Sequence, residues 1–208
     1  MPLLVDIDAL CKLAHWRLLS QLPELTGQQW EECATLESAK YRARRSVEHP
    51  DGRIFHSTDA AQEALNSILL MTGSISPDAE HMSRLQDLSG VDAGEAVLFA
   101  AIACAPDARL LTGDKRALRT ISALPKEARA SYAGKIVAVE QVLMAALDKY
   151  GLERLRLSVC PWKMIDIAVS SIMGSHCDMP ESSVREGLTS YINELACLCE
   201  PTLIAGRL

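Results

Sequence analysis

Acidic side chains stand at the ends of apolar segments in three separate places along this chain. Asp6 directly follows the apolar run at the start, Asp114 follows the stretch Arg109–Thr112, and Glu95 opens a long apolar segment. Two carboxylates about 4 Å apart repel each other by roughly 1 kcal/mol in water, and by more inside a protein. If the fold gathers these acids, the cluster must take up protons or bind a cation.

The cation that suits such a cluster is Mg²⁺ or Mn²⁺, because both prefer hard oxygen ligands. A metal held by carboxylates activates water and stabilises the charge that develops during phosphodiester cleavage. Asp92, close to Glu95, and Glu37 are weaker candidates for the same set. The sequence therefore predicts a metal site with Asp6, Glu95 and Asp114 as its main ligands.

Most of these acids also have a purely structural interpretation. Asp92-Ala-Gly-Glu95 matches a capping box, in which both acids close the start of a helix. Asp114 suits the N-cap of a following helix, and Glu37 suits a solvated helix face. Asp6 is the hardest to explain in this way. The shared position of the acids after strand or helix breaks favours a site.

Apolar periodicity predicts the elements that position these acids. A short buried strand lies at the start of the chain and feeds a helix that continues to Ser20. The further expected elements are a helix over Gln28–Arg45, a buried helix over Ala96–Ala105, a strand over Arg109–Thr112, a helix over Lys115–Leu124 and a strand over Lys135–Leu143. In the helix over Gln28–Arg45, two stripes compete for the core: one of Trp30, Cys33, Ala34 and Tyr41, the other of Leu36, Ala39 and Ala43.

Strands that alternate with helices indicate a parallel sheet covered on both faces. The expected fold class is therefore α/β, a three-layer α/β/α sandwich over residues 1–150 with a central, mostly parallel sheet. Such sheets bind their ligands at the carboxyl ends of the strands. Residues 151–208 form an expected helical extension that packs on the core or on a partner. Its two amphipathic helices are expected around Trp162–Ile172 and Val184–Leu198.

The charge balance limits how the chain can bind nucleic acid. The net charge of −6 argues against coating of nucleic acid by bulk attraction, but leaves room for a local basic groove. Lys115, Arg116 and Arg119 follow Asp114 directly and are expected to hold substrate phosphates, with an exposed helix face as the alternative. The densest basic stretch comprises Lys40, Arg42, Arg44, Arg45 and Arg53, for which a solvated face is the plainer interpretation.

The cysteines and the hydropathy indicate the compartment. Seven cysteines without a CxxC pair suggest reduced thiols in a cytoplasmic protein. No signal peptide and no membrane span are expected, because no apolar run is long enough. A zinc site that joins Cys197 and Cys199 to His176 and Cys177 is an open alternative. The histidines show no other ligand spacing, and serine-hydrolase, P-loop and dinucleotide motifs are missing.

Three stretches of the chain resemble one known family. LLVDIDAL, VDAGEAVLFAAIA and ARLLTGDKRAL resemble PIN-domain proteins, which are metal-dependent nucleases that include many bacterial toxin–antitoxin ribonucleases. The likeness covers about residues 2–143. It implies that Asp6, Glu95 and Asp114 are the catalytic and metal-binding acids, and that the hydroxyl of Thr112 orients a carboxylate or a water. The expected helical extension after about residue 151 makes this chain longer than the compact toxins of the family.

The expected function is therefore that of a PIN-type endoribonuclease that uses Mg²⁺ or Mn²⁺, with a toxin-type role among the expectations. RNA is the expected substrate, and an antitoxin-like protein or a second copy of the chain is the expected partner. One alternative is a PIN-like binding or scaffold module without catalysis that acts through its helical extension. A further alternative is a metal-dependent phosphatase or DNA flap nuclease on a related sheet.

Overall fold

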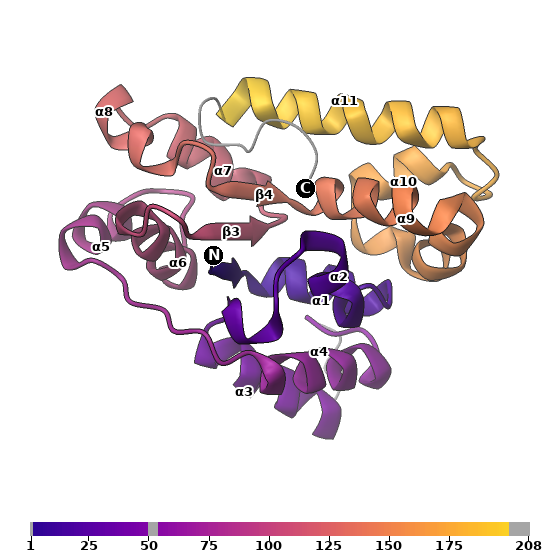
Figure 1. The fold of residues 1–208 in the computed structure, drawn as a ribbon, viewed down its shortest axis with the longest axis horizontal. Helices are drawn as coiled ribbons and strands as arrows, with labels where there is room; N and C mark the ends of the chain where they lie inside the picture. The colour runs from indigo at the N-terminus through magenta and orange to yellow at the C-terminus, as the bar shows by residue number, and fades with distance from the viewer. Residues whose placement is uncertain (1, 50–53, 200–208) are drawn as a thin grey trace.

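One parallel sheet lies at the centre of the protein (Figure 1). The computed structural model describes residues 2–49 and 54–199, and the described sheet has four strands in the order β2-β1-β3-β4. The strands are β1 (Leu3–Val5), β2 (Cys33–Ala34), β3 (Arg109–Thr112) and β4 (Ile136–Ala138). All three pairings are parallel, and in register Leu4 pairs with Leu110, which pairs with Ile136.

Alternation of side chains along each strand divides the apolar core into two clusters. Leu3, Val5, Leu111 and Val137 belong to one cluster, whereas Leu4, Leu110 and Ile136 belong to the other. Because successive side chains of a strand point to opposite faces, the two clusters lie on opposite faces of the sheet. Both faces are therefore covered, as expected for an α/β protein with a layered α/β/α arrangement.

Different helices cover the two faces. The Leu3 cluster takes in buried side chains of α1 (Ile7–His15), α2 (Leu22–Thr26), α3 (Glu37–Glu48), α4 (Thr58–Leu70), α9 (Val139–Val159) and α10 (Ile167–Met173). The Leu4 cluster takes in buried side chains of α5 (Ala79–Gln86), α6 (Ala93–Cys104) and α7 (Lys115–Ser122). The short helix α8 (Lys126–Arg129) follows α7, and α11 (Glu181–Cys199) contributes to both clusters.

The predicted helix over Gln28–Arg45 is wrong in its first half. A 3₁₀ turn at Trp30–Glu32 leads into β2, which pairs with β1, and α3 begins only at Glu37. A strand of two residues is too short to show a period of two, so the apolar residues of β2 fit a helical pattern as well as a strand. Ala39 and Ala43 face the core, whereas Tyr41 is 66% exposed, so the second of the two competing stripes is the buried one.

The predicted strand over Lys135–Leu143 is correct only for its first part. β4 ends at Ala138, and α9 begins at Val139. The valines suit a strand, but the side chain of Gln141 accepts a hydrogen bond from the N–H of Ala138 (2.9 Å) and so starts a helix there. Burial on all sides explains the apolar run, because the first turns of α9 lie inside the core.

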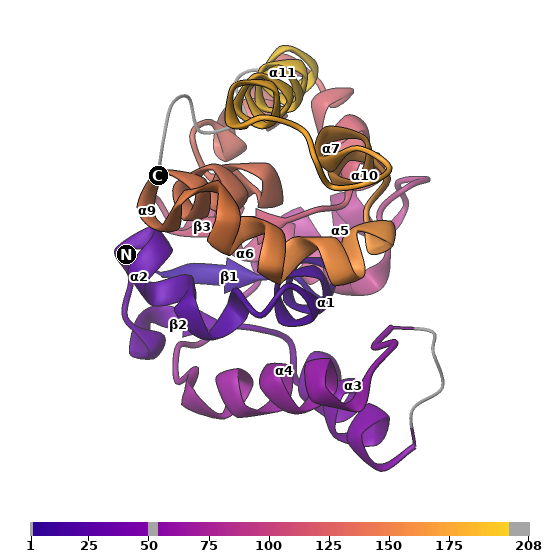
Figure 2. The same cartoon turned by 90° about the vertical axis from the view of Figure 1, so that its right-hand side faces the viewer.

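The helices after Gly151 pack against the same core as β1. Gly151 lies inside α9 at a positive φ of 76°, which kinks the helix at the expected domain boundary. Leu155, Val169 and Leu188 belong to the same apolar cluster as Leu3. Figure 1 shows α11 running alongside α9 and α7, and Figure 2 shows the α3–α4 pair on the opposite side of the molecule. The division into two domains stays a prediction.

Two of the cysteines correct the expectation of thiols throughout. Cys160 and Cys177 form a disulfide between the 3₁₀ segment Cys160–Ile165 and the loop that precedes α11. This bond removes Cys177 from the zinc site considered above, and the side chain of Cys199 lies outside the described part of the structure. Within the described residues, no helix combines the length and the apolar character that a membrane crossing requires.

Candidate carboxylate site

Asp6 lies where β1 passes into α1. Its N–H donates to the carbonyl of Leu111 (3.0 Å), which extends the pairing of β1 with β3 by one residue. Its side chain caps α1, because Oδ1 accepts from the N–H of Ile7 (2.7 Å). Oδ2 accepts from the hydroxyl of Thr112 (3.1 Å). The carboxyl group is only 5% exposed, so its orientation is fixed by buried contacts.

Thr112 connects Asp6 to Asp114. The Oγ1 atom that donates to Asp6 also accepts from the N–H of Asp114 (3.1 Å). Asp114 caps α7, since its Oδ1 accepts from the N–H groups of Arg116 (2.8 Å) and Ala117 (3.0 Å). The hydroxyl of Thr112 therefore joins two of the three predicted acids.

Gly113 permits this turn because there is no room for a side chain. A Cβ atom at Gly113 would lie 2.4 Å from Oδ2 of Asp8 and 2.7 Å from Nζ of Lys12. The Thr-Gly-Asp turn thus packs directly onto the first turns of α1. The same close approach places Asp114 beside the N-terminal end of α1.

Glu95 reaches the same edge of the sheet from the start of α6. Asp92 and Glu95 form a complete capping box: the N–H of Glu95 donates to Asp92 Oδ1 (2.8 Å), and the N–H of Asp92 donates to Glu95 Oε2 (2.7 Å). Glu95 is buried, with 6% exposure, and its carboxyl group lies close enough to that of Asp114 for each to shift the pKa of the other. The structural role expected of Asp92 and Glu95 is therefore real, and Glu95 also meets Asp114.

The buried carboxyl groups hold protons more tightly than free ones. Burial, and then the negative charge of Asp8, raise the pKa of Asp6 to about 6. Burial, the hydrogen bond to Asp114 and the charge of Asp114 raise the pKa of Glu95 to about 8. Burial also pushes the pKa of Asp114 upward, but hydrogen bonds from Ala117, Glu95 and Arg116 outweigh it, so that pKa is lowered. At neutral pH Glu95 therefore keeps its proton, whereas the neighbouring Asp114 is ionised.

The two weaker candidates of the predicted acid set, Asp92 and Glu37, are exposed. Asp92 is exposed and serves the capping box. Glu37 is exposed in the first turn of α3, and no contact found among the described residues joins it to the other acids. Asp92 therefore contacts the acids only through its capping box with Glu95, and Glu37 stays outside the group of Asp6, Asp114 and Glu95.

The predicted basic residues differ in their positions. Arg116 lies closest to the acids, with its guanidinium 3.6 Å from Asp114 Oδ2 and 3.9 Å from Glu95 Oε1. Lys115 instead pairs with Glu140 (2.9 Å) and lies over the ring of Tyr191 (4.6 Å to the centroid). Arg119 is exposed one helical turn beyond Arg116. Arg42, Arg44 and Arg45 are exposed on α3, and Arg53 lies outside the described residues.

Lys12 and Asp166 were not singled out in the sequence, yet they border the site. Nζ of the buried Lys12 contacts Asp8 (2.7 Å) and Asp166 (2.9 Å), and donates to the carbonyl of Gly113 (3.5 Å). Burial opposes its charge, but Asp8 and Asp166 outweigh burial and raise the pKa of Lys12. The i, i+4 spacing of Asp8 and Lys12 was visible in the sequence. The contact with Asp166, from the start of α10, depends on the tertiary fold.

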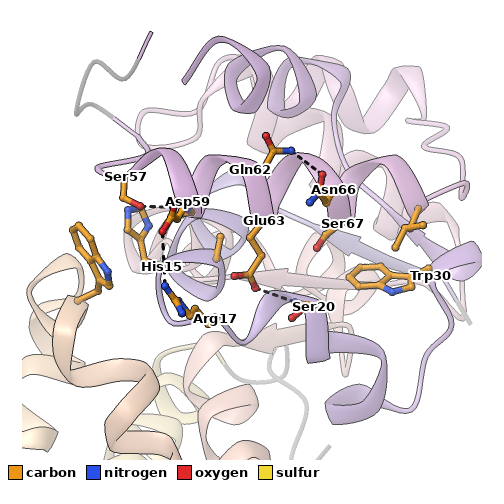
Figure 3. A pocket seen from close by; sticks show the side chains of 14 residues that line it. His15, Arg17, Ser20, Trp30, Ser57, Asp59, Gln62, Glu63, Asn66 and Ser67 are labelled. Carbon is orange, nitrogen blue, oxygen red and sulfur yellow. Dashed lines mark hydrogen bonds and ion pairs between the residues drawn. The ribbon is translucent and has the colours of Figure 1, made fainter. Parts of the chain in front are cut away.

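A small cleft lies beside Asp114, and a larger one lies elsewhere. The small cleft, of about 330 Å³, is lined by Asp8, Lys12, Asp114, Lys115 and Asp166, among others. The larger pocket, of about 580 Å³, lies along α4 and contains none of the predicted acids. Figure 3 shows Glu63 turned toward Ser20, with Trp30 at one end of this pocket. We base the site on the acids, because perturbed carboxyl groups indicate chemistry better than cavity size does.

The acids fit a metal only in part as they stand. Asp6, Glu95 and Asp114 do not form, within the described residues, a trio whose ligand atoms all lie within 4.8 Å of one another; Asp78, His81 and Cys104 do. A divalent ion at the acids would have to displace the proton of Glu95 and draw the three carboxyl groups closer together. Comparison of the chain with protein-family models, curated proteins and solved structures gives no match. The proposals below therefore rest on the residues and their geometry.

Proposed function

We propose that this protein is a PIN-type nuclease that hydrolyses RNA phosphodiesters with the help of Mg²⁺ or Mn²⁺. One observation carries the proposal: the carboxyl groups of Asp6, Glu95 and the half-buried Asp114 gather at the carboxyl edge of a parallel sheet, where Thr112 links Asp6 to Asp114 and burial and the charge of Asp114 raise the pKa of Glu95. Burying several acids without a cation is unfavourable, and proton uptake relieves that cost only in part. A divalent ion relieves it further.

Asp6, Asp114 and Glu95 would hold the ion, whose role is to activate water and to stabilise charge on the phosphate. Glu95 must release its proton when the ion binds, and Asp114 is already ionised at neutral pH. Thr112 keeps Asp6 and Asp114 in their relative positions through its hydroxyl. The side chain of Arg116 is exposed beside Asp114 and Glu95, where it would bind a substrate phosphate.

Lys12 supports this arrangement without reaching the substrate. It forms ion pairs with Asp8 and Asp166 and so offsets part of their negative charge beside the cluster. Because Asp166 opens α10, this ion pair also fixes the residues after Gly151 against the site. The proposed toxin-type role would need a partner that covers Arg116 and the acids beside it. An antitoxin-like protein or a second copy of this chain would be such a partner.

The competing proposal is a PIN-like binding or scaffold module without catalysis. Its support is that the ligand atoms of the three acids are not all within 4.8 Å of one another. The proton of Glu95 and the guanidinium of Arg116 already offset part of the negative charge of these acids. A phosphatase or a DNA flap nuclease would use the same acids on another substrate. Metal binding separates the enzymes from the scaffold, and substrate choice separates the enzymes from one another.

The test is cleavage of a mixed single-stranded RNA pool with Mn²⁺ or Mg²⁺, with EDTA as the negative control. Glu95→Gln and Asp114→Asn should abolish cleavage and keep the fold, since both replacements preserve a capping side chain. Asp107→Asn is the matched control, because Asp107 is an exposed acid in the turn before β3. Equal cleavage by the wild type and Glu95→Gln would reject the proposed site. Absence of both cleavage and Mn²⁺ binding by calorimetry would favour the scaffold.

A further inference from the structure

A second group of ligand-type side chains lies at the far end of α6. Asp78 caps α5, His81 lies in the first turn of α5, and Cys104 is the last residue of α6. Their Oδ1, Nδ1 and Sγ atoms all lie within 4.8 Å of one another. Cys104 is nine residues beyond Glu95 on α6, so about 14 Å of helix separates this group from the carboxylate site.

Two of the separations within this group come close to those in the coordination shell of zinc. Zn²⁺ bonds of about 2.3 Å to sulfur and about 2.0 Å to nitrogen, at a tetrahedral angle, place the two ligand atoms about 3.5 Å apart. The distance from Cys104 Sγ to His81 Nδ1 is 3.5 Å. Asp78 Oδ1 lies 3.0 Å from the same nitrogen, a few tenths of an ångström closer than a tetrahedral shell requires. Only a small outward movement of the carboxylate would be needed.

Local structure holds the three side chains in place. The carboxylate of Asp78 accepts from the N–H groups of Glu80 and His81 (both 3.0 Å), which fixes it beside the imidazole. The ammonium of Lys135 donates to the carbonyls of Ile102 (2.7 Å) and Ala103 (3.4 Å) and ties down the end of α6 that carries Cys104.

We propose that Asp78, His81 and Cys104 form a zinc site that joins the start of α5 to the end of α6. One thiolate, one imidazole and one carboxylate favour Zn²⁺ over Mg²⁺, because sulfur and nitrogen are poor ligands for the harder ion. Three protein ligands leave the fourth position for water or for a ligand from a partner. Cys104 and His81 must lose or lack a proton at their ligand atoms, so the affinity falls as the pH falls.

Co²⁺ is the probe, because a thiolate bound to Co²⁺ gives a charge-transfer absorption band that carboxylates cannot give. The wild-type protein should show this band with one Co²⁺ per chain, and one equivalent of Zn²⁺ should remove it. Cys104→Ser and His81→Gln should lose the band, and Asp78→Asn, which keeps a capping side chain, should weaken it. Circular dichroism establishes that each variant is folded.

Two controls make the assignment specific. Cys197→Ser removes another exposed cysteine, from α11, and should leave the band unchanged. Asp6→Asn alters the carboxylate site at the other end of α6 and should also leave it unchanged. A wild-type protein without the band would overturn the proposal. So would a band that survives Cys104→Ser, or one that is lost with Cys104→Ser but indifferent to both His81→Gln and Asp78→Asn.

Discussion

Asp6→Asn should stabilise the protein, and the gain should depend on pH. The pKa of Asp6 is raised from 3.8 to about 6, so the folded protein holds this proton more tightly than the unfolded chain does. The free energy of unfolding therefore falls as the pH rises from about 3.8 to about 6, and above that range the full loss of stability is present. At about 1.4 kcal/mol for each pH unit, the penalty is about 3 kcal/mol at pH 8.

The substitution removes this penalty because an asparagine does not ionise. Its oxygen can still accept from the N–H of Ile7, and its NH₂ group would meet the hydroxyl of Thr112, which must then act as acceptor. That exchange costs about 1 kcal/mol at every pH. The difference in unfolding free energy, variant minus wild type, should thus be slightly negative near pH 4 and rise by about 2.4 kcal/mol by pH 8.

Urea unfolding at pH 4, 6 and 8, followed by circular dichroism without metal, measures this difference. The denaturant slopes of the two proteins must agree for the comparison to hold. Asp107→Asn serves as the control, because Asp107 is exposed and its replacement should shift stability little at any pH. A difference for Asp6→Asn that does not change between pH 4 and pH 8 would refute the argument that ionisation of Asp6 destabilises the folded protein.

Two further predictions concern packing. Gly113→Ala would place a Cβ atom 2.4 Å from Oδ2 of Asp8 and should cost about 1–3 kcal/mol in thermal or urea unfolding, because it disturbs the ion pair of Asp8 with Lys12; an unchanged stability would mean that these two side chains can shift without loss. Leu188→Ala should cost about 2–5 kcal/mol, because Leu188 is fully buried in the core shared with β1. Leu157→Ala, at a leucine that is 75% exposed, is its control and should change stability by less than about 0.5 kcal/mol.

The sequence predicted the elements that hold Asp6, Glu95 and Asp114 because each has a strong local signal. A fully apolar run closed by an acid marks β1, and Thr-Gly-Asp marks the end of β3. β2 escaped prediction because two residues carry no period, and the start of α9 was missed because buried valines suit strand and helix equally. The disulfide of Cys160 and Cys177 and the contact of Lys12 with Asp166 depend on chain segments that only the tertiary fold brings together.

His81 illustrates the same limit for metal ligands. Its spacing from Asp78 is visible in the sequence, but neither residue is notable there without a third ligand. Cys104 supplies that third atom from a different helix, 23 residues away in the chain from His81. Spacing rules find ligands that share one element, and they miss a set that is completed by the packing of α5 against α6.

The sequence offered helix capping and a shared acid cluster as alternatives, but in the structure Asp114 and Glu95 both cap helix starts and lie beside each other. One oxygen of Asp114 is fixed by the N–H groups of Arg116 and Ala117, and one oxygen of Glu95 is fixed by the N–H of Asp92. The other oxygen of each, Oδ2 of Asp114 and Oε1 of Glu95, faces the guanidinium of Arg116. Helix starts thus orient the free oxygens toward a common point without a long, flexible side chain. A carboxylate that caps a helix is for that reason a better-placed ligand, since its orientation is set before any cation arrives.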